Sequence, residues 1–580
     1  MPLAQYWSLL AQYLQRQTGK VVLLAALIFS GVGFQLINPQ VVRYFIDTAM
    51  ADGTTRQLIS AASLFFVIAL VRQAVSLGAG YLSEDIGWQA TNALRADLAE
   101  HCLRLDMAFH NKHTPGEMIE RIDGDVQILA NFFSHLMLRV VGSGFLIVGV
   151  LAVLFFEDWR IGLVLTGFTL LIIVYLQKTL PLIVPYAEEN QQVNAEVSSF
   201  LEERLAATED IGASGAKGFV LNQLYQLYRR RWPIQRKNAV VVASILGIFN
   251  TSLTAFNAVG LALGIYFFWQ GAITLGTVYL LYQYTVSLFS PLRQLLNQAS
   301  ELQKTTASLN RIQQFLAIKS DLPGQDQVQL PATIPAVHFQ NVSFAYEADQ
   351  PKPILHRLSF DVDAGQVLGV LGRTGSGKTT IARLLLRLYD PTSGQIRLGD
   401  TVLQTITPAY LRTHVGMVTQ DVQLLRATVR ENLTFFDSGL SDDQIWRALE
   451  QVELATWARE LPKGLDTKLT GSSGLSAGEA QLLALARVFL KNPKLIILDE
   501  ASSRLDPATE QRIERAIDQL LANRTAIIIA HRLTTVQRAD QILVLEAGKI
   551  AEYGPRTTLA QNPDSHFFQL MQTGLGTATT

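Results

Sequence analysis

The sequence contains almost no cysteine, and its positive and negative charges nearly cancel. Because Cys102 is the single cysteine, an intrachain disulfide is excluded and a cysteine-based metal site is not expected. The 48 Lys and Arg residues are balanced by 49 Asp and Glu residues, so charge gives no reason to expect nucleic-acid binding. The mean hydropathy of +0.22 is high for a soluble protein, which indicates that lipid solvates part of the chain.

The first twenty residues lack the marks of a secretory signal. They have no basic start and no small-residue cleavage site, so an amphipathic helix on the membrane surface is the better interpretation.

The 580-residue length predicts at least two domains, and the pattern changes near residue 320. Long apolar runs with sparse charge come before this point. Short apolar segments, Gly-rich turns and helical stretches follow it, as in an α/β domain. The segment SDLPGQDQVQLPATIP is polar and contains proline. We therefore expect a transmembrane domain at 1–319, a linker at 320–335 and an α/β domain at 336–580.

The first half contains six apolar runs, each long enough for a spanning helix of about 20 residues. Runs such as FLIVGVLAVLFF have no polar face, which favours spanning helices over the buried helices of a soluble bundle. The predicted spans are 21–47, 58–82, 137–157, 160–184, 240–270 and 274–298.

Two long polar stretches separate the second span from the third and the fourth from the fifth. Each has more than fifty residues with a helical pattern, so we expect helices that continue beyond the bilayer. Both stretches are rich in Lys and Arg. The positive-inside rule therefore places them, both termini and the C-terminal half in the cytoplasm.

Three basic residues fall inside the predicted spans. Arg72 lies in the middle of FFVIALVRQAVSLGAG, where it either lines a substrate pathway or pairs with a group inside the bundle. Arg43 and Lys178 lie nearer the ends of their runs, so snorkelling to the interface explains them more simply.

The motif GRTGSGKTT follows the apolar segment QVLGVL and precedes a helical pattern, which is the context of a phosphate-binding loop. Its glycines let backbone N–H groups surround phosphate, Lys378 neutralises β- and γ-phosphate charge, and Thr379 offers a hydroxyl to Mg²⁺. The predicted ATP-binding residues are Gly372, Arg373, Thr374, Gly375, Ser376, Gly377, Lys378, Thr379 and Thr380.

The segment LIILDE predicts a buried strand that ends in two carboxylates. Asp499 is suited to the Mg²⁺ shell, and Glu500 to polarising the attacking water as a general base. Without the phosphate-binding loop, the pair could equally cap the following helix.

Together these motifs resemble the nucleotide-binding domain of an ABC transporter, and the whole chain resembles an ABC exporter half-transporter. That resemblance implies a six-span α-helical transmembrane domain fused to an α/β P-loop domain. It also implies that Tyr346 stacks on adenine, Gln420 joins the Mg²⁺ shell and catalysis, Asp506 lies at a dimer seam and His531 reaches the γ-phosphate. Coupling helices are expected near Thr114–Gly116 and Thr208–Ser214.

The five-residue signature of this family normally reads LSGGQ, and here it reads LSAGE. The resemblance implies that Ser476 and Gly478 contact the γ-phosphate of ATP held by a partner subunit. Ala477 adds a methyl group where the backbone must approach phosphate, and Glu479 adds a carboxylate that repels it unless the side chain turns away. The preceding TGSSG and Arg504 also depart from the family pattern.

A complete phosphate-binding loop with an altered signature favours a heterodimer that has one weak ATP site. The alternative is a homodimer in which LSAGE is a variant that works normally.

We expect ATP-driven export across a bacterial inner membrane, with ATP and Mg²⁺ as cofactors. The partners are a second half-transporter, membrane lipids and a transported substrate; drugs, lipids and peptides remain equally open as substrates. A soluble ABC protein and an ATP-gated channel or regulator are the competing functions.

Overall fold

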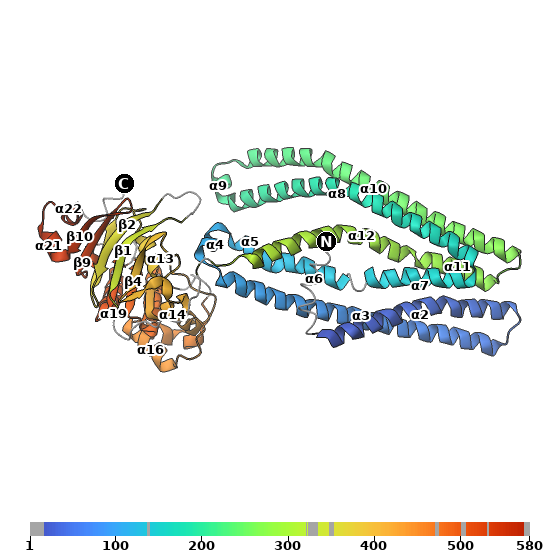
Figure 1. Cartoon of the computed structure of the whole chain (residues 1–580), viewed down its shortest axis with the longest axis horizontal. Coiled ribbons are helices and arrows are strands. Elements are labelled where there is room, and N and C mark those ends of the chain that lie inside the picture. Colours follow the sequence, from blue (N-terminus) through green and yellow to red (C-terminus); the bar gives the residue numbers. More distant parts are fainter. Residues whose placement is uncertain are drawn as a thin grey trace. The chain divides into compact units, whose positions relative to one another are not determined.

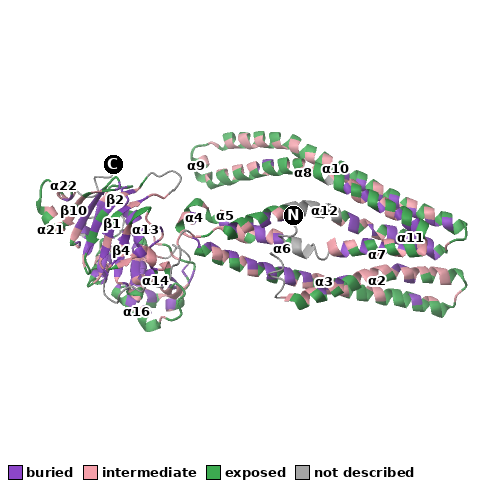
Figure 2. Cartoon of the chain, viewed as in Figure 1, coloured by how far each residue is buried: buried purple, intermediate pink, exposed green. Residues whose placement is uncertain are grey.

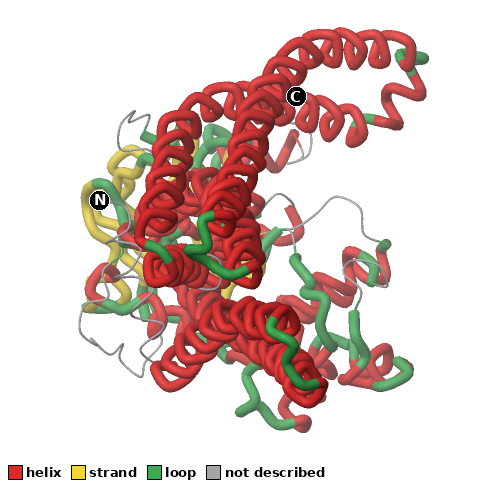
Figure 3. Tube along the Cα trace, turned by 90° about the vertical axis from the view of Figure 1, so that its right-hand side faces the viewer, coloured by secondary structure: helices red, strands yellow, loops and turns green. Residues whose placement is uncertain are grey.

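The computed structural model describes residues 17–135, 140–320, 322, 335–346, 353–420, 422–469, 475–499, 506–530 and 533–573 (Figure 1). The chain forms two compact units: Met1–Leu103 with Thr114–Ile318, and Arg104–His113 with Lys319–Thr580. The first is helical and the second is α/β. Across the described ranges, strands occur only in the second unit (Figure 3). The predicted linker at 320–335 lies mostly outside the described residues, as does the predicted surface helix at the N-terminus.

Long helices dominate the helical unit. At about 1.5 Å per residue, a helix of 50 residues extends about 75 Å, more than twice the hydrocarbon thickness of a bilayer. The predicted continuation of helices beyond the bilayer is thus confirmed. The helices are α2 (Thr18–Met50), α3 (Thr55–Arg104), α5 (Pro115–Ile119), the π-helix η2 (Glu120–Asp125), α6 (Val126–His135), α7 (Gly142–Glu157), α8 (Trp159–Ala206), α9 (Thr208–Ala213), α10 (Lys217–Trp269), α11 (Leu275–Ser287) and α12 (Phe289–Ala317).

Four helices in the described residues are long and apolar enough to cross a membrane: α2, α3, α8 and α10. The third predicted span corresponds to the shorter apolar helix α7. The sixth is divided at Leu288 between α11 and α12. Large apolar side chains face outward, among them Phe156 at 91% exposure and Trp269 at 84%. Figure 2 shows this exposure along the helices, and it is the arrangement that lipid rather than water stabilises.

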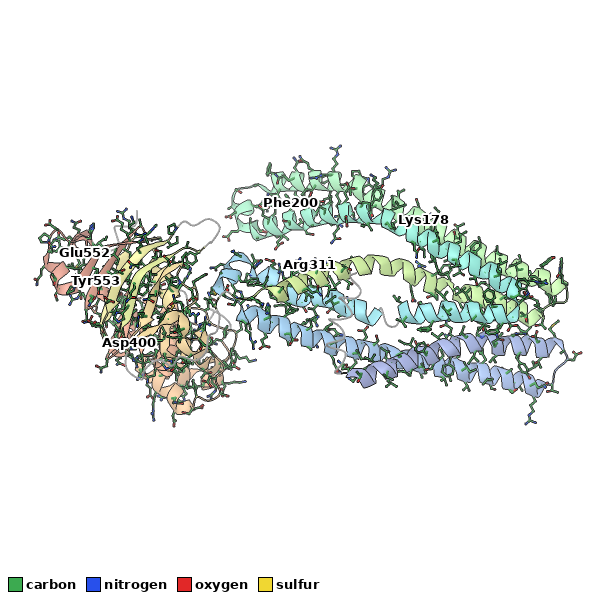
Figure 4. All side chains as sticks on the ribbon, in the orientation of Figure 1. Lys178, Phe200, Arg311, Asp400, Glu552 and Tyr553 are labelled. Carbon is green, nitrogen blue, oxygen red and sulfur yellow. The ribbon has the colours of Figure 1, made fainter. Side chains whose placement is uncertain are left out.

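Polar contacts join three of these helices near their ends. Arg43 of α2 donates to Glu157 of α7, with 2.5 Å between Nη1 and Oε1. Asp47 accepts from the Thr274 hydroxyl at 2.8 Å and from the N–H of Gly276 at 2.9 Å. The interpretation of Arg43 as a snorkelling residue is therefore wrong: it is ion-paired to a neighbouring helix. Lys178, by contrast, is exposed on α8, as Figure 4 shows.

The α/β unit contains two sheets. An antiparallel sheet has the order β2-β1-β4-β5, and a second sheet has the order β10-β9-β3-β8-β7-β6. In the second sheet β9, β3, β8, β7 and β6 are parallel, and β10 is an antiparallel edge strand. The strands are β1 (Val337–Phe344), β2 (Leu355–Val362), β3 (Val367–Gly372), β4 (Ser393–Leu398), β5 (Thr401–Val402), β6 (Val415–Val418), β7 (Leu495–Asp499), β8 (Thr525–Ile529), β9 (Gln541–Glu546) and β10 (Lys549–Pro555).

The core strands β7 and β8 are buried at all five positions, as expected for mostly apolar strands of a sheet covered on both faces. Helices and 3₁₀ turns complete this unit. They are α4 (Met107–Lys112), α13 (Lys378–Leu385), η4 (Leu403–Thr405), α14 (Pro408–His414), α15 (Val429–Thr434), α16 (Asp442–Gln451), α17 (Ala455–Glu460), η5 (Gly464–Asp466), α18 (Ala477–Lys491), α19 (Pro507–Leu521), α20 (Leu533–Val536), α21 (Arg556–Gln561) and α22 (His566–Thr573).

A short segment from the N-terminal half, Arg104–His113, belongs to the α/β unit. Its helix α4 buries Phe109, and Asn111 donates to the hydroxyl of Tyr389 with 2.5 Å between Nδ2 and Oη. Thr114, in the first predicted coupling segment, caps the start of α5, and the coupling role of this segment stays a prediction. The second predicted segment forms the exposed helix α9.

Candidate nucleotide-binding site

The predicted phosphate-binding loop connects strand β3 directly to helix α13. Gly372 has φ +148° and Gly377 has φ +103°, conformations that L side chains rarely adopt. A Cβ on Gly372 would lie 2.3 Å from the carbonyl oxygen of Leu545, and a Cβ on Gly377 would lie 2.5 Å from Leu355. The two glycines are therefore required by the backbone path and by close packing, and the path leaves the N-terminus of α13 open.

Two buried polar side chains point to an anion at this loop. Lys378 is 6% exposed, and its Nζ donates to the carbonyl oxygens of Gly372 at 2.6 Å and Arg373 at 3.1 Å. Ser376 is 4% exposed, and its Oγ has no hydrogen-bond partner among the described residues. A buried hydroxyl without a partner is costly, so a ligand that supplies one fits here. A phosphate group bound by backbone N–H groups of this loop and by Lys378 would give the Ser376 hydroxyl that partner.

Burial lowers the pKa of Lys378, while the negative charge of Asp499 opposes the shift. Asp499 ends β7 and is 6% exposed. Within the described part of the chain, no group of three or more His, Cys, Asp and Glu residues could hold a metal ion. A single strand-terminal carboxylate does fit Mg²⁺ when phosphates supply further ligands, which is the usual mode of Mg²⁺ binding. Thr379, the other predicted ligand, is exposed.

Two predicted catalytic residues, Glu500 and His531, lie outside the described residues. Both follow strands that the structure does place: Glu500 comes directly after β7, and His531 follows β8 by two positions. Because these strands are parallel neighbours, their carboxyl ends lie at the same edge of the sheet. Gln420 follows the next strand, β6, at the same edge; its side chain is exposed and accepts or donates no hydrogen bond among the described residues.

Tyr346 lies beside α13. Its hydroxyl is 3.1 Å from the Thr380 Oγ1 and accepts from the Arg383 guanidinium at 3.0 Å. Its ring makes edge contacts with Phe344 and with Tyr389, the latter at 5.1 Å between centroids. Arg383 was missed by the sequence reasoning. Its spacing of three residues from Thr380, which places both on one helix face, is the signal that could have found it.

The signature segment is folded onto itself at the N-terminus of α18. The N–H and the hydroxyl of Ser476 both donate to Glu479 Oε2, at 2.8 and 2.9 Å, and the Glu479 N–H donates to Ser476 Oγ at 3.2 Å. This reciprocal arrangement is a capping box. Gly478 is buried within it. The Glu479 carboxylate therefore does not turn away from the helix end but covers it.

Asp506 caps α19. Its carboxylate accepts from the Thr509 N–H at 2.9 Å, and hydrogen bonds from the Thr509 backbone and hydroxyl lower its pKa. The described residues thus give Asp506 a structural role, and its predicted place at a dimer seam stays a prediction.

Comparisons with known proteins agree with this geometry. A family model described as "ABC transporter transmembrane region" matches residues 21–292, and one described as "ABC transporter" matches residues 355–503. A relative from Bacillus subtilis (strain 168), the ABC transporter ATP-binding protein YfiC, is 30% identical over 567 residues, which cover 96% of this chain and 92% of the relative. The chain belongs to the ABC transporter family.

Other relatives of this transporter indicate its type. An ATP-dependent lipid A-core flippase from Idiomarina loihiensis is 30% identical, with 90% of each chain covered. A solved structure titled as a bacterial Atm1-family ABC exporter with ATP bound superposes with a TM-score of 0.80 and 25% identity, covering 97% of this chain and 98% of that one. The predicted helical transmembrane domain and α/β ATPase domain are confirmed, and a soluble ABC protein is excluded. The transporter is an ATP-dependent exporter or flippase of the membrane.

Proposed function

We propose that this transporter pairs with a different half-transporter and that the two ATP sites of the dimer are unequal. The observation that carries the proposal is the capping box of α18, in which Glu479 covers the helix end that faces nucleotide in the family's composite sites. The other half of a site, provided by β3 and α13, is open and carries a buried lysine.

In the proposed hydrolytic site, this chain supplies the phosphate-binding half. Backbone N–H groups from Gly372 to Thr380 and the Lys378 ammonium hold the phosphates, and the buried Ser376 hydroxyl gains a partner. Thr379, Asp499 and Gln420 complete the Mg²⁺ shell, and Tyr346 stacks on adenine. Glu500 polarises the attacking water, and His531 contacts the γ-phosphate. The partner contributes an unaltered signature.

In the second site this chain supplies LSAGE, and ATP is bound there rather than hydrolysed. An incoming γ-phosphate would have to compete with the Glu479 carboxylate for the Ser476 hydroxyl and N–H. It would also meet like charge at a helix terminus where a single anion is stabilising. Both effects weaken the phosphate contact without abolishing it, since Ser476 and Gly478 are retained.

The proposed direction of transport is out of the cytoplasm. Lys and Arg are frequent in the polar part of α10 (Lys217, Arg229, Arg230, Arg231, Arg236 and Lys237), which favours a cytoplasmic location for this part and for the ATPase unit. The proposed location is a bacterial inner membrane. The substrate is a small molecule, lipid or peptide that leaves the cytosol or the inner leaflet. Inside-out vesicles that contain the transporter are expected to accumulate substrate with ATP and Mg²⁺; a requirement for an external binding protein would contradict export.

The pairing is tested by purifying the chain alone and together with a half-transporter encoded beside it. We expect little ATP hydrolysis from the chain alone and full hydrolysis from the pair. Native mass spectrometry gives the stoichiometry of each preparation. A symmetric, fully active dimer of this chain alone would establish the homodimer and overturn the proposal.

A further inference from the structure

Tyr346, the residue proposed to stack on adenine, lies two residues beyond the end of strand β1. Because it lies outside the hydrogen-bond ladder of the sheet, the placement of its ring depends on side-chain contacts. The ring is nearly perpendicular to those of Phe344 and Tyr389, with interplanar angles of 84° and 87°. Among the aromatic side chains that the structure describes, none stacks in parallel on Tyr346, which leaves that geometry to a bound base.

Arg383 contacts the hydroxyl end of the Tyr346 ring. Its Nη1 donates to the hydroxyl oxygen at 3.0 Å. The guanidinium carbon lies 5.7 Å from the ring centroid, near the outer limit of about 6 Å for a cation–π contact, so the hydroxyl is its main partner. Because the guanidinium is planar and always charged, this charge-assisted bond fixes the direction of the ring as well as its distance.

The same hydroxyl also contacts the phosphate-binding loop. It lies 3.1 Å from Oγ1 of Thr380, which is 5% exposed and is one of the proposed phosphate-binding residues. Arg383 can only donate, so the phenol keeps its own hydrogen for the Thr380 oxygen. Thr380 and Arg383 are three positions apart on α13 and share a face of that helix. The helix that begins at the phosphate-binding loop therefore holds the tyrosine in place through two of its side chains.

We propose that Arg383 is a positioning residue for adenine recognition, because it holds the Tyr346 ring against α13 as a preformed stacking surface. The proposal rests on the proposed function, which assigns Tyr346 to adenine. Without Arg383 the tyrosine side chain would gain rotamer freedom, and bound ATP would have to remove that freedom at a cost in affinity. The hydrogen bonds of Lys378 go to Gly372 and Arg373, so the phosphate contacts should not change.

The test compares two ligands of the full purified transporter, in the dimer that it forms. ATP carries a base and phosphates, whereas inorganic tripolyphosphate carries phosphates alone. Equilibrium binding of each is measured without Mg²⁺, so that ATP is not hydrolysed. Arg383→Met should weaken ATP binding about three- to tenfold, the effect of losing one hydrogen bond, and should leave tripolyphosphate binding unchanged. Arg383→Lys still donates and should retain most of the ATP affinity.

A double-mutant cycle tests whether Arg383 acts through the hydroxyl. Tyr346→Phe keeps the stacking ring and removes the hydroxyl, so it should weaken ATP binding as Arg383→Met does. The double variant should be no weaker than either single variant, because both changes break the same contact. If Arg383→Met does not fold, Tyr346→Phe still tests that contact with both ligands.

Two further measurements separate positioning from a general structural effect. Arg447→Met removes an exposed arginine from α16; it is the matched control and should bind both ligands as the unmodified protein does. In hydrolysis assays with Mg²⁺, Arg383→Met should raise KM for ATP and leave kcat nearly unchanged. A loss of folded protein would instead lower the apparent kcat at constant KM.

Three results would overturn the proposal. They are unchanged ATP binding in Arg383→Met, equal losses for ATP and tripolyphosphate, which would mean that Arg383 acts on phosphate, and additive losses in the double variant. Tyr346→Ala separates this inference from the proposed function, and a loss of about tenfold or more is expected from it. If Tyr346→Ala weakens ATP binding and Arg383→Met does not, adenine stacking stands and this inference fails. If neither change weakens it, the assignment of Tyr346 to adenine fails as well.

Discussion

Two helix N-termini of the ATPase unit, those of α13 and α18, differ in how their N–H groups are satisfied. The residue before α13 is Gly377, which offers no side-chain cap, and the nearby Ser376 hydroxyl lacks a described partner. The residue before α18 is Ser476, whose cap is completed by the carboxylate of Glu479. The N-terminus of α13 has no side-chain cap and can bind an anion, whereas the N-terminus of α18 is already covered by the Glu479 carboxylate. Both ends are expected at ATP sites, so the two sites of a dimer are unequal if the partner's signature helix lacks the carboxylate that closes α18.

The largest expected effect is at the α13 end. Glu500→Gln should lower ATP hydrolysis by about 10²- to 10⁴-fold, because it removes the general base. Binding of ATP should persist, since the phosphate-binding loop is unchanged. Lys378→Ala should instead impair binding itself. Hydrolysis and nucleotide binding are measured on the same purified pair; unchanged hydrolysis in Glu500→Gln would show that Glu500 is not the base.

The next largest effect separates the two dimers. Ser476→Arg places a bulky cation at the closed end of α18 and removes the cap. In a heterodimer a substantial part of the hydrolysis should survive, because the hydrolytic site uses the partner's signature. In a homodimer both sites use Ser476, and nearly all hydrolysis should be lost. Turnover of the purified pair decides between them.

A more moderate effect is expected when the closed end is opened. Ala477→Gly with Glu479→Gln restores the family signature and removes the competing carboxylate. ATP affinity at that site should rise about two- to fivefold, the size of one charge effect at a helix terminus. Turnover should change little, because the proposed partner lacks a base there. A large rise in turnover would indicate that LSAGE limits hydrolysis and would favour the homodimer.

The smallest effect concerns pH at the open end. Burial holds the pKa of Lys378 below its ordinary value, and Asp499 opposes the shift. Phosphate is attracted by the protonated amine, so ATP affinity should be full below the lowered pKa and should fall as pH rises through it. An unperturbed lysine would lose its proton only at about pH 10.4. Lys378→Arg keeps its charge and should show no such fall; the same fall in both proteins would exclude Lys378 as the cause.

Local sequence patterns were sufficient to predict elements that depend on neighbouring residues, namely a buried strand, the phosphate-binding turn and the apolar helices. The segment LIILDE predicts a buried strand that ends in carboxylates, and GRTGSGKTT predicts the turn between β3 and α13, because close approach and positive φ demand glycine. The long apolar runs likewise predict lipid-facing helices, since a helix without a polar face has to be solvated by lipid.

Contacts between distant segments were decided only in three dimensions. The sequence shows Arg43 and Glu157 as charges 114 positions apart, and folding brings them to 2.5 Å. It shows Asn111 in the N-terminal half, and folding brings it to Tyr389. It also left open which way Glu479 points. The sequence by itself determined which residues carry charge, apolar surface and turns; only the tertiary structure decided which of them meet, because side-chain partners depend on helix packing and rotamers that no local pattern encodes.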